Sequence, residues 1–166
     1  MSQLTVKGRV WKFGDNINTD VITPGKYLSL PIDELKRHVM EPLDSEFCTK
    51  VKLGDVIVAG RNFACGSSRE QAPAALKALG VSAIIAKGFA RIFFRNAISL
   101  GLPVMVCEGI SEAVEQGDLL EVNIETGRLT NLKLGQTFAT KALSKQMIET
   151  LKAGGAISLL KKRFEK

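Results

Sequence analysis

The sequence predicts a mixed α/β protein, in which a parallel centre is joined to an antiparallel β portion. Strand-like and helix-like segments alternate between residues 56 and 106, which is typical of parallel βαβ units. Beyond residue 117, two short strand-like segments flank Glu125-Thr126-Gly127, a hairpin signal. The length of 166 residues suits one domain with a substantial core, so we expect residues 1–166 to form a single domain.

The N-terminal segments are the least regular. Residues 4–13 alternate in part and predict a first strand, and residues 14–20 are rich in turn formers. Residues 21–30 mix apolar and loop character. Residues 31–40 predict a short helix with Pro31 near its start, where a missing N–H costs nothing.

The alternating region follows. It comprises the strands 56–59, 81–86 and 103–106 and the helices 71–79 and 89–100. Pro73 falls in the first turn of its helix, where proline is tolerated, and Gly80 and Gly101 follow the two helices. The C-terminal part comprises the hairpin strands 118–123 and 128–132, a strand around Phe138, and the helices 144–151 and 156–162, separated at Gly154-Gly155.

Composition excludes several classes. With 45% hydrophobic and 24% charged residues, the chain is globular, and no apolar run could span a membrane. Because the first residues lack the features of a signal peptide, we expect a cytoplasmic location. Residues 141–166 hold seven Lys or Arg and two Glu, which supply +5 of the net +6. Phe164 is the single aromatic residue of this segment, so there is no series of stacking platforms, and we expect no nucleic-acid partner.

The cysteines do not form a metal-binding pattern. Cys48, Cys65 and Cys107 are far apart, no C-x-x-C pair exists, and His38 is the only histidine. We therefore expect free thiols and no metal site made by this chain alone.

The segment from Asn62 to Glu70 carries the strongest chemical signal. Ser67, Ser68 and Arg69 lie between a buried strand and a helix, where free N–H groups and the helix dipole favour an anion. The same residues fit the S-x-x-E capping box, in which Ser67 and Glu70 would merely cap the helix.

Three blocks together indicate a family. They are Asn18-Thr19-Asp20 with the following Ile22-Thr23-Pro24 and Tyr27-Leu28, then Gly66–Glu70, then Ala86–Ala97. In this order they resemble the small subunit of the 3-isopropylmalate dehydratase and homoaconitase group, the swivel domain of the aconitase superfamily. The resemblance implies a three-layer β/β/α swivelling fold.

The resemblance also implies an activity. It implies a hydro-lyase of leucine biosynthesis that moves the hydroxyl of a hydroxy-dicarboxylic acid to the neighbouring carbon by dehydration and rehydration. In this family a separate large subunit ligates a [4Fe–4S] cluster, which acts as a Lewis acid. We expect this chain to be active only with that partner and to bind no cluster alone.

The resemblance assigns roles to the anion-binding segment. Ser67 matches the base that removes the proton next to a carboxylate, and the N–H groups of Ser68 and Arg69 would stabilise its alkoxide. Arg69 matches the clamp on the substrate carboxylate. Asp20 matches a position near the active site, with a positioning role expected; the alternative is an Asp that only stabilises a turn.

Substrate choice is expected to depend on Tyr27, Leu28, Ser29 and Leu30, which match the family's specificity loop. Ser29 stands where members that bind a distal carboxylate carry a cation, so we favour an apolar γ-group, as in isopropylmalate. Homoaconitase, dimethylmalate and citramalate dehydratases remain alternatives, and Lys26 could swing into the site. Lys87, Arg91 and Arg95 are open between substrate site, subunit contact and exposed helix surface.

Two other classes compete with this assignment. A serine hydrolase would use Ser67 as nucleophile and His38 as base, although G-x-S-x-G is missing around Ser67. A non-catalytic module would use the same segment only to bind an anion or to serve as a scaffold.

Overall fold

The computed structural model describes residues 4–165 and contains one seven-stranded sheet in the order β4-β3-β2-β1-β5-β6-β7. The strands are β1 (Thr5–Lys12), β2 (Val56–Ala59), β3 (Ala83–Ala86), β4 (Val104–Val106), β5 (Leu119–Asn123), β6 (Arg128–Asn131) and β7 (Gln136–Ala139). β1 to β4 pair in parallel, whereas β1-β5, β5-β6 and β6-β7 are antiparallel. β1 therefore belongs to both halves of the sheet.

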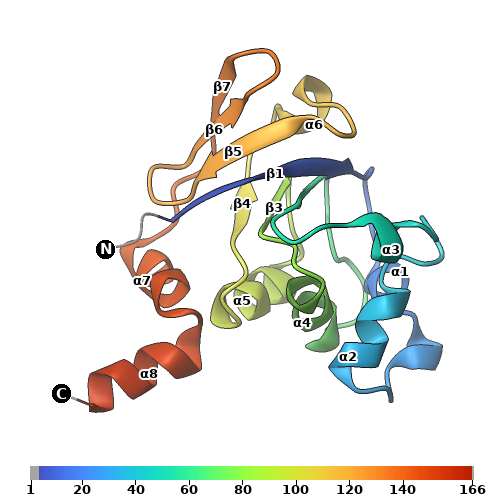
Figure 1. The fold of residues 1–166 in the computed structure, drawn as a ribbon. Coiled ribbons are helices and arrows are strands. Elements are labelled where there is room, and N and C mark those ends of the chain that lie inside the picture. Colours follow the sequence, from blue (N-terminus) through green and yellow to red (C-terminus); the bar gives the residue numbers. More distant parts are fainter. Residues whose placement is uncertain (1–3, 166) are drawn as a thin grey trace.

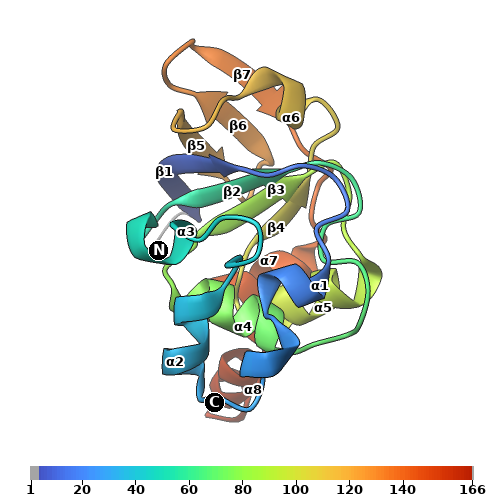
Figure 2. The same ribbon diagram turned by 90° about the vertical axis from the view of Figure 1, so that its right-hand side faces the viewer.

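The helices lie mainly on one side of the parallel strands. They are α1 (Thr19–Ile22), α2 (Ile32–Leu35), α3 (Phe47–Lys50), α4 (Gln71–Ala78), α5 (Arg91–Ser99), α6 (Ile110–Ala113), α7 (Lys145–Ala153) and α8 (Ala156–Phe164), with 3-10 turns η1 (Gly25–Tyr27) and η2 (Lys36–His38). The crossovers β2-α4-β3 and β3-α5-β4 advance in the same direction, so equal handedness puts α4 and α5 on one face. Figure 1 and Figure 2 show the resulting layers: antiparallel strands, parallel strands, then helices.

The core lies between the parallel strands and the helices. All residues of β2 and β3 are buried, which agrees with their unbroken apolar sequences. Phe47 of α3 is fully buried and packs edge-on against Trp11 and Phe13 of the first strand region, with ring centroids 5.1 and 5.6 Å apart. The Trp11 indole N–H donates to Asp55 Oδ2 at 2.9 Å, so its polar atom is satisfied.

The expected fold class is confirmed. Every predicted strand is present, as are the two crossover helices, the hairpin at Gly127 and the two C-terminal helices. The four-residue helices α1, α3 and α6 were not predicted, because one helical turn leaves no periodicity to detect. No helix among residues 4–165 is long and apolar enough to cross a membrane.

Candidate functional site

Three of the expected site residues, Ser67, Ser68 and Arg69, lie where three parallel strands end. Because β1, β2 and β3 are parallel, their carboxyl ends share one edge of the sheet, where open α/β sheets bind ligands. A cavity of about 290 Å³ opens there between the loop before α4 and the start of α5. It is lined by Thr19, Ala64, Gly66, Ser67, Ser68, Arg69, Ala90, Arg91, Ile92, Phe93 and Asn96.

The loop between β2 and α4 is held by backbone pairing to both neighbouring connections. The Ala64 N–H donates to the Ile17 carbonyl at 2.7 Å, and the Thr19 N–H donates to the Cys65 carbonyl at 2.9 Å. On the other side, Phe63 forms a parallel bridge with Phe89. These bonds bring the three sequence blocks together, although they are far apart in the chain.

Gly66 turns the loop toward the serines. Its φ of +94° is a conformation that side chains disfavour, and Ala64 also has a positive φ, of 65°. A Cβ on Gly66 would lie 2.8 Å from the side-chain amide of Asn18. Asn18 in turn caps α1, accepting from the Asp20 N–H at 2.8 Å.

The capping box is not formed. α4 begins at Gln71, its N-cap is Glu70, and no side chain caps it. The N–H groups of Ser67, Ser68 and Arg69 donate to no acceptor among residues 4–165. The Ser67 carbonyl accepts from Thr19 Oγ1 at 2.9 Å, so this part of the loop is tied to α1. The result is a set of free donors beside two exposed hydroxyls, suited to an anion.

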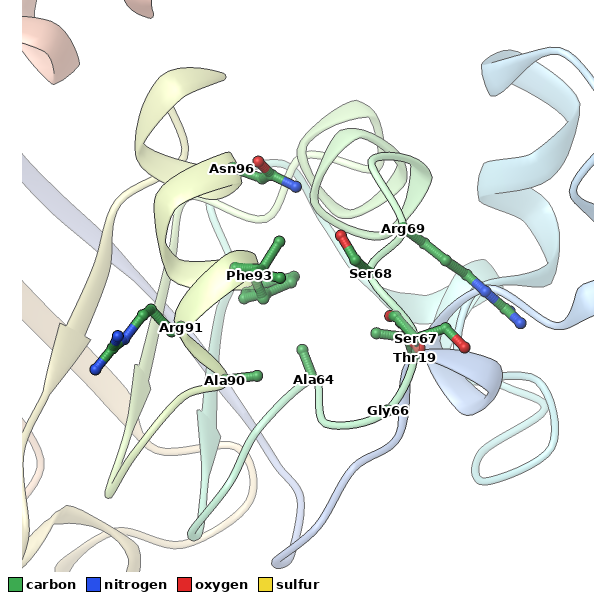
Figure 3. A pocket seen from close by; sticks show the side chains of 11 residues that line it. Thr19, Ala64, Gly66, Ser67, Ser68, Arg69, Ala90, Arg91, Phe93 and Asn96 are labelled. Carbon is green, nitrogen blue, oxygen red and sulfur yellow. Dashed lines mark hydrogen bonds between the residues drawn. The ribbon is translucent and has the colours of Figure 1, made fainter.

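Arg69 is fixed in orientation. One terminal nitrogen lies 2.7 Å from Asp20 Oδ1, and the other donates to the Thr23 carbonyl at 2.8 Å. The Arg69 side chain is 17% exposed and that of Asp20 is 65% exposed. Asp20 therefore does more than take part in the first turn of α1, where its N–H donates to Asn18. Its carboxylate also connects it to the site through Arg69. Figure 3 shows Arg69 directed away from the cavity, toward α1.

The opposite wall of the cavity comes from α5. Phe93 is buried and Asn96 lies one turn further on, and both face the serine loop across the cavity (Figure 3). Their part in the wall was not predicted from the sequence, and neither was that of Thr19, because nothing in one helix shows which loop it will face. The sequence left the roles of three cationic residues undecided. Arg91 lies at the edge of the cavity, Lys87 pairs with Glu112, and Arg95 is exposed.

The expected specificity loop lies apart from this cavity. Tyr27 is the last residue of η1, Leu28, Ser29 and Leu30 follow it, and none of the four lines the cavity. Lys26 Nζ lies over the Tyr27 ring, 5.0 Å from its centroid. The connection between the two regions is Arg69, which contacts residues just upstream of the loop.

The structure gives no support to a Ser–His pair. His38 Nδ1 lies 2.7 Å from Glu41 Oε2, and the imidazole stacks on Tyr27. Within residues 4–165 no hydrogen bond joins His38 to Ser67. In the same part of the chain no group of three or more His, Cys, Asp or Glu is placed to hold a metal ion, so these residues do not fit a cluster site.

Comparison with known proteins places the chain in a family. The family described as "Aconitase C-terminal domain" matches residues 14–108, which include all three loops at the strand ends. The chain belongs to this family. The match begins just after β1 and ends two residues beyond β4, so it covers β2, β3, β4 and the candidate site.

Two named relatives match along nearly the whole chain. The isopropylmalate/citramalate isomerase small subunit of Methanocaldococcus jannaschii is 54% identical over 161 residues, covering 96% of this chain and 95% of that protein. The methanogen homoaconitase small subunit of Methanothermobacter thermautotrophicus is 49% identical over 154 residues, covering 92% and 89%. The crystal structure of 3-isopropylmalate dehydratase from M. jannaschii superposes with a TM-score of 0.90, at 44% identity, over 96% and 95% of the two chains.

Proposed function

We propose that this chain is the small subunit of a hydro-lyase that interconverts 2-isopropylmalate and 3-isopropylmalate by dehydration and rehydration. The observation that carries the proposal is the arrangement of Ser67, with free N–H donors around it, next to an Arg69 whose fork is already oriented. Relatives named for this group of reactions support the reaction class.

Ser67 is assigned as the base. Removing a proton from the carbon next to a carboxylate needs an oxyanion on Ser67, which is costly in water. The free N–H groups of Ser67, Ser68 and Arg69 would stabilise negative charge there, and the positive charge of Arg69 would add to this effect. Arg69 would hold a substrate carboxylate, and Asp20 would keep the guanidinium in place while the substrate enters and leaves.

The remaining chemistry would come from a large subunit. Ser67 and Ser68 are exposed in this chain, so a partner is needed to exclude water from them. We propose that this partner also ligates a [4Fe–4S] cluster, which when bound supplies the Lewis acid toward the substrate hydroxyl. The small-subunit names of the relatives agree with a two-subunit enzyme.

The proposed substrate carries an uncharged γ-group. The loop Tyr27–Leu30 contains no cation, and Lys26 sits over the Tyr27 ring. A distal carboxylate would therefore enter without a counter-charge from this loop. This favours isopropylmalate, or the smaller citramalate, over homocitrate.

The test is a substrate panel on the complex reconstituted with its large subunit. Isopropylmalate, citramalate, dimethylmalate, homocitrate and citrate are compared by kcat/KM, with Ser67→Ala and Ser68→Ala alongside the natural chain. We expect Ser67→Ala to reduce turnover by at least about 10³-fold while the two subunits still co-elute. Full activity of the Ser67→Ala complex would refute the assigned base, and preference for homocitrate would refute the assigned substrate.

A further inference from the structure

Tyr27, at the start of the proposed specificity loop, is held by two side chains from a later segment. The Tyr27 hydroxyl donates to Glu41 Oε1 at 3.0 Å, and His38 Nδ1 lies 2.7 Å from Glu41 Oε2. The Tyr27 and His38 rings are stacked, with centroids 3.7 Å apart and an interplanar angle of 11°. We call these three residues the Tyr27 bracket; they include the only tyrosine and the only histidine of the sequence.

Glu41 is the residue that joins the bracket, because each of its carboxylate oxygens contacts a different ring. Its hydrogen bonds with His38 and Tyr27 lower the pKa of the Glu41 carboxyl, so it is ionised near neutral pH and accepts from both partners. Lys26 Nζ lies over the Tyr27 ring as well. The bracket is thus a partly exposed arrangement of polar side chains.

The loop depends on side-chain contacts for its attachment, because its own backbone hydrogen bonds are local. The N–H groups of Tyr27, Leu28 and Leu30 each donate to the carbonyl three residues earlier. These turns fix the local shape of the loop but do not attach it to the rest of the protein. Upstream, the loop is attached where Arg69 donates to the Thr23 carbonyl. Tyr27 and Leu30 also pack against the hydrophobic core. The next polar attachment along the chain is the Tyr27 bracket.

We propose that Glu41 is a positioning residue for substrate discrimination: it holds Tyr27 and thereby sets how the loop Tyr27–Leu30 faces the γ-group of the substrate. This inference rests on the proposed function. Loss of the bracket lets the loop sample several conformations, so the loop distinguishes an isopropyl from a methyl group less well. The proton removal assigned to Ser67 is unaffected, so kcat stays nearly constant.

The kinetic test uses Glu41→Ala, Glu41→Gln and the matched control Glu46→Ala in the reconstituted complex. Glu46 lies on the same segment and is 65% exposed, paired only with Lys50 among the described residues. We expect Glu41→Ala to lower the ratio of kcat/KM for isopropylmalate to that for citramalate about fivefold, through KM. Glu41→Gln keeps an acceptor for the Tyr27 hydroxyl and should restore at least half of the ratio. Glu46→Ala should leave it unchanged.

A second measurement reports on the loop without activity. Trypsin cleaves after Lys26, within the loop segment, so the rate of that cut in the full chain measures how often the loop opens. We expect roughly fivefold faster cleavage after Lys26 in Glu41→Ala than in Glu46→Ala, with equal rates at other sites. Mass spectrometry of the fragments assigns the cut.

Two results would overturn the inference. One is an unchanged substrate ratio in Glu41→Ala with cleavage after Lys26 at the control rate. The other is an equal fall of kcat for both acids, because that would mark a general structural defect. If the complex with the unchanged chain is inert toward every acid in the panel, the proposed function is refuted. The trypsin cleavage rates would still show whether Glu41 holds the loop, because they do not depend on activity.

Discussion

Gly66→Ala should disturb both the serine loop and the start of α1, because a side chain at position 66 would collide with Asn18, which caps α1. An alanine at a φ of +94° costs about 1–2 kcal/mol in backbone strain. Its Cβ would lie 2.8 Å from the Asn18 amide, so Asn18 must move. Losing the Asn18 cap on the Asp20 N–H costs about 1 kcal/mol more. We therefore expect the free energy of unfolding to fall by roughly 2–3 kcal/mol.

Urea denaturation of the full chain measures this loss, and Gly109→Ala is the matched control. Gly109 has a φ of −90°, which alanine adopts readily, and a Cβ added there would have no atom within 4 Å. This alanine should therefore change the urea midpoint little. At about 2–4 °C per kcal/mol for a chain of this size, Gly66→Ala should melt roughly 5–10 °C lower. In the complex, turnover should fall as well, since Ser67 follows Gly66 directly.

A double-mutant cycle separates the collision from the strain. Asn18→Ala alone loses the cap, about 1 kcal/mol, and also removes the atoms that the new Cβ meets. In Gly66→Ala/Asn18→Ala the cap is lost only once, so the two effects should fall short of additivity by about 1 kcal/mol. Additive losses would show that the Cβ does not displace Asn18 and would refute this coupling.

Three further predictions can be checked with two single variants and with the unchanged chain. Arg69→Lys keeps the charge but loses the fork that contacts both Asp20 and the Thr23 carbonyl, so KM in the complex should rise about tenfold, measured by steady-state kinetics. Burial raises the pKa of the Cys48 thiol to about 11, so its labelling rate at pH 8 should be low and should climb steadily up to pH 11. Phe47→Ala empties a fully buried position and should cost about 3–5 kcal/mol of unfolding free energy, measured in urea.

The fold was predictable where local sequence and burial agree. Val56–Ala59 and Ala83–Ala86 are short apolar runs next to helical patterns, and both are strands buried at every residue. The C-terminal Gly154-Gly155 break was predictable for the same local reason, since Gly154 ends α7 with a φ of 88°. What local pattern could not give is α3, whose single turn is present because Phe47 packs against Trp11 and Phe13.

The site was predictable only in part, because its geometry depends on distant contacts. The S-x-x-E pattern at Ser67 predicts a cap, yet Thr19 draws the Ser67 carbonyl toward α1, and the helix begins later, at Gln71. In two places, segments come together whose local sequences do not predict the contact. One is the cavity wall on α5, and the other is the stacking of His38 on Tyr27. The sequence therefore predicts which chemical groups are present, whereas hydrogen bonds between distant segments determine how those groups are oriented.

The exposure of the site residues connects the chemistry to the need for a partner. A serine oxyanion surrounded by water gains little from N–H donors, because water competes with them and screens the Arg69 charge. Once a partner surface covers Ser67, each of those interactions strengthens. In the proposed complex, covering the 65% exposed Asp20 would likewise turn its ion pair with Arg69 from a weak surface pair into a desolvated one. Under the proposed function, the geometry is therefore preformed in this chain, whereas its energetic effect would require the second subunit.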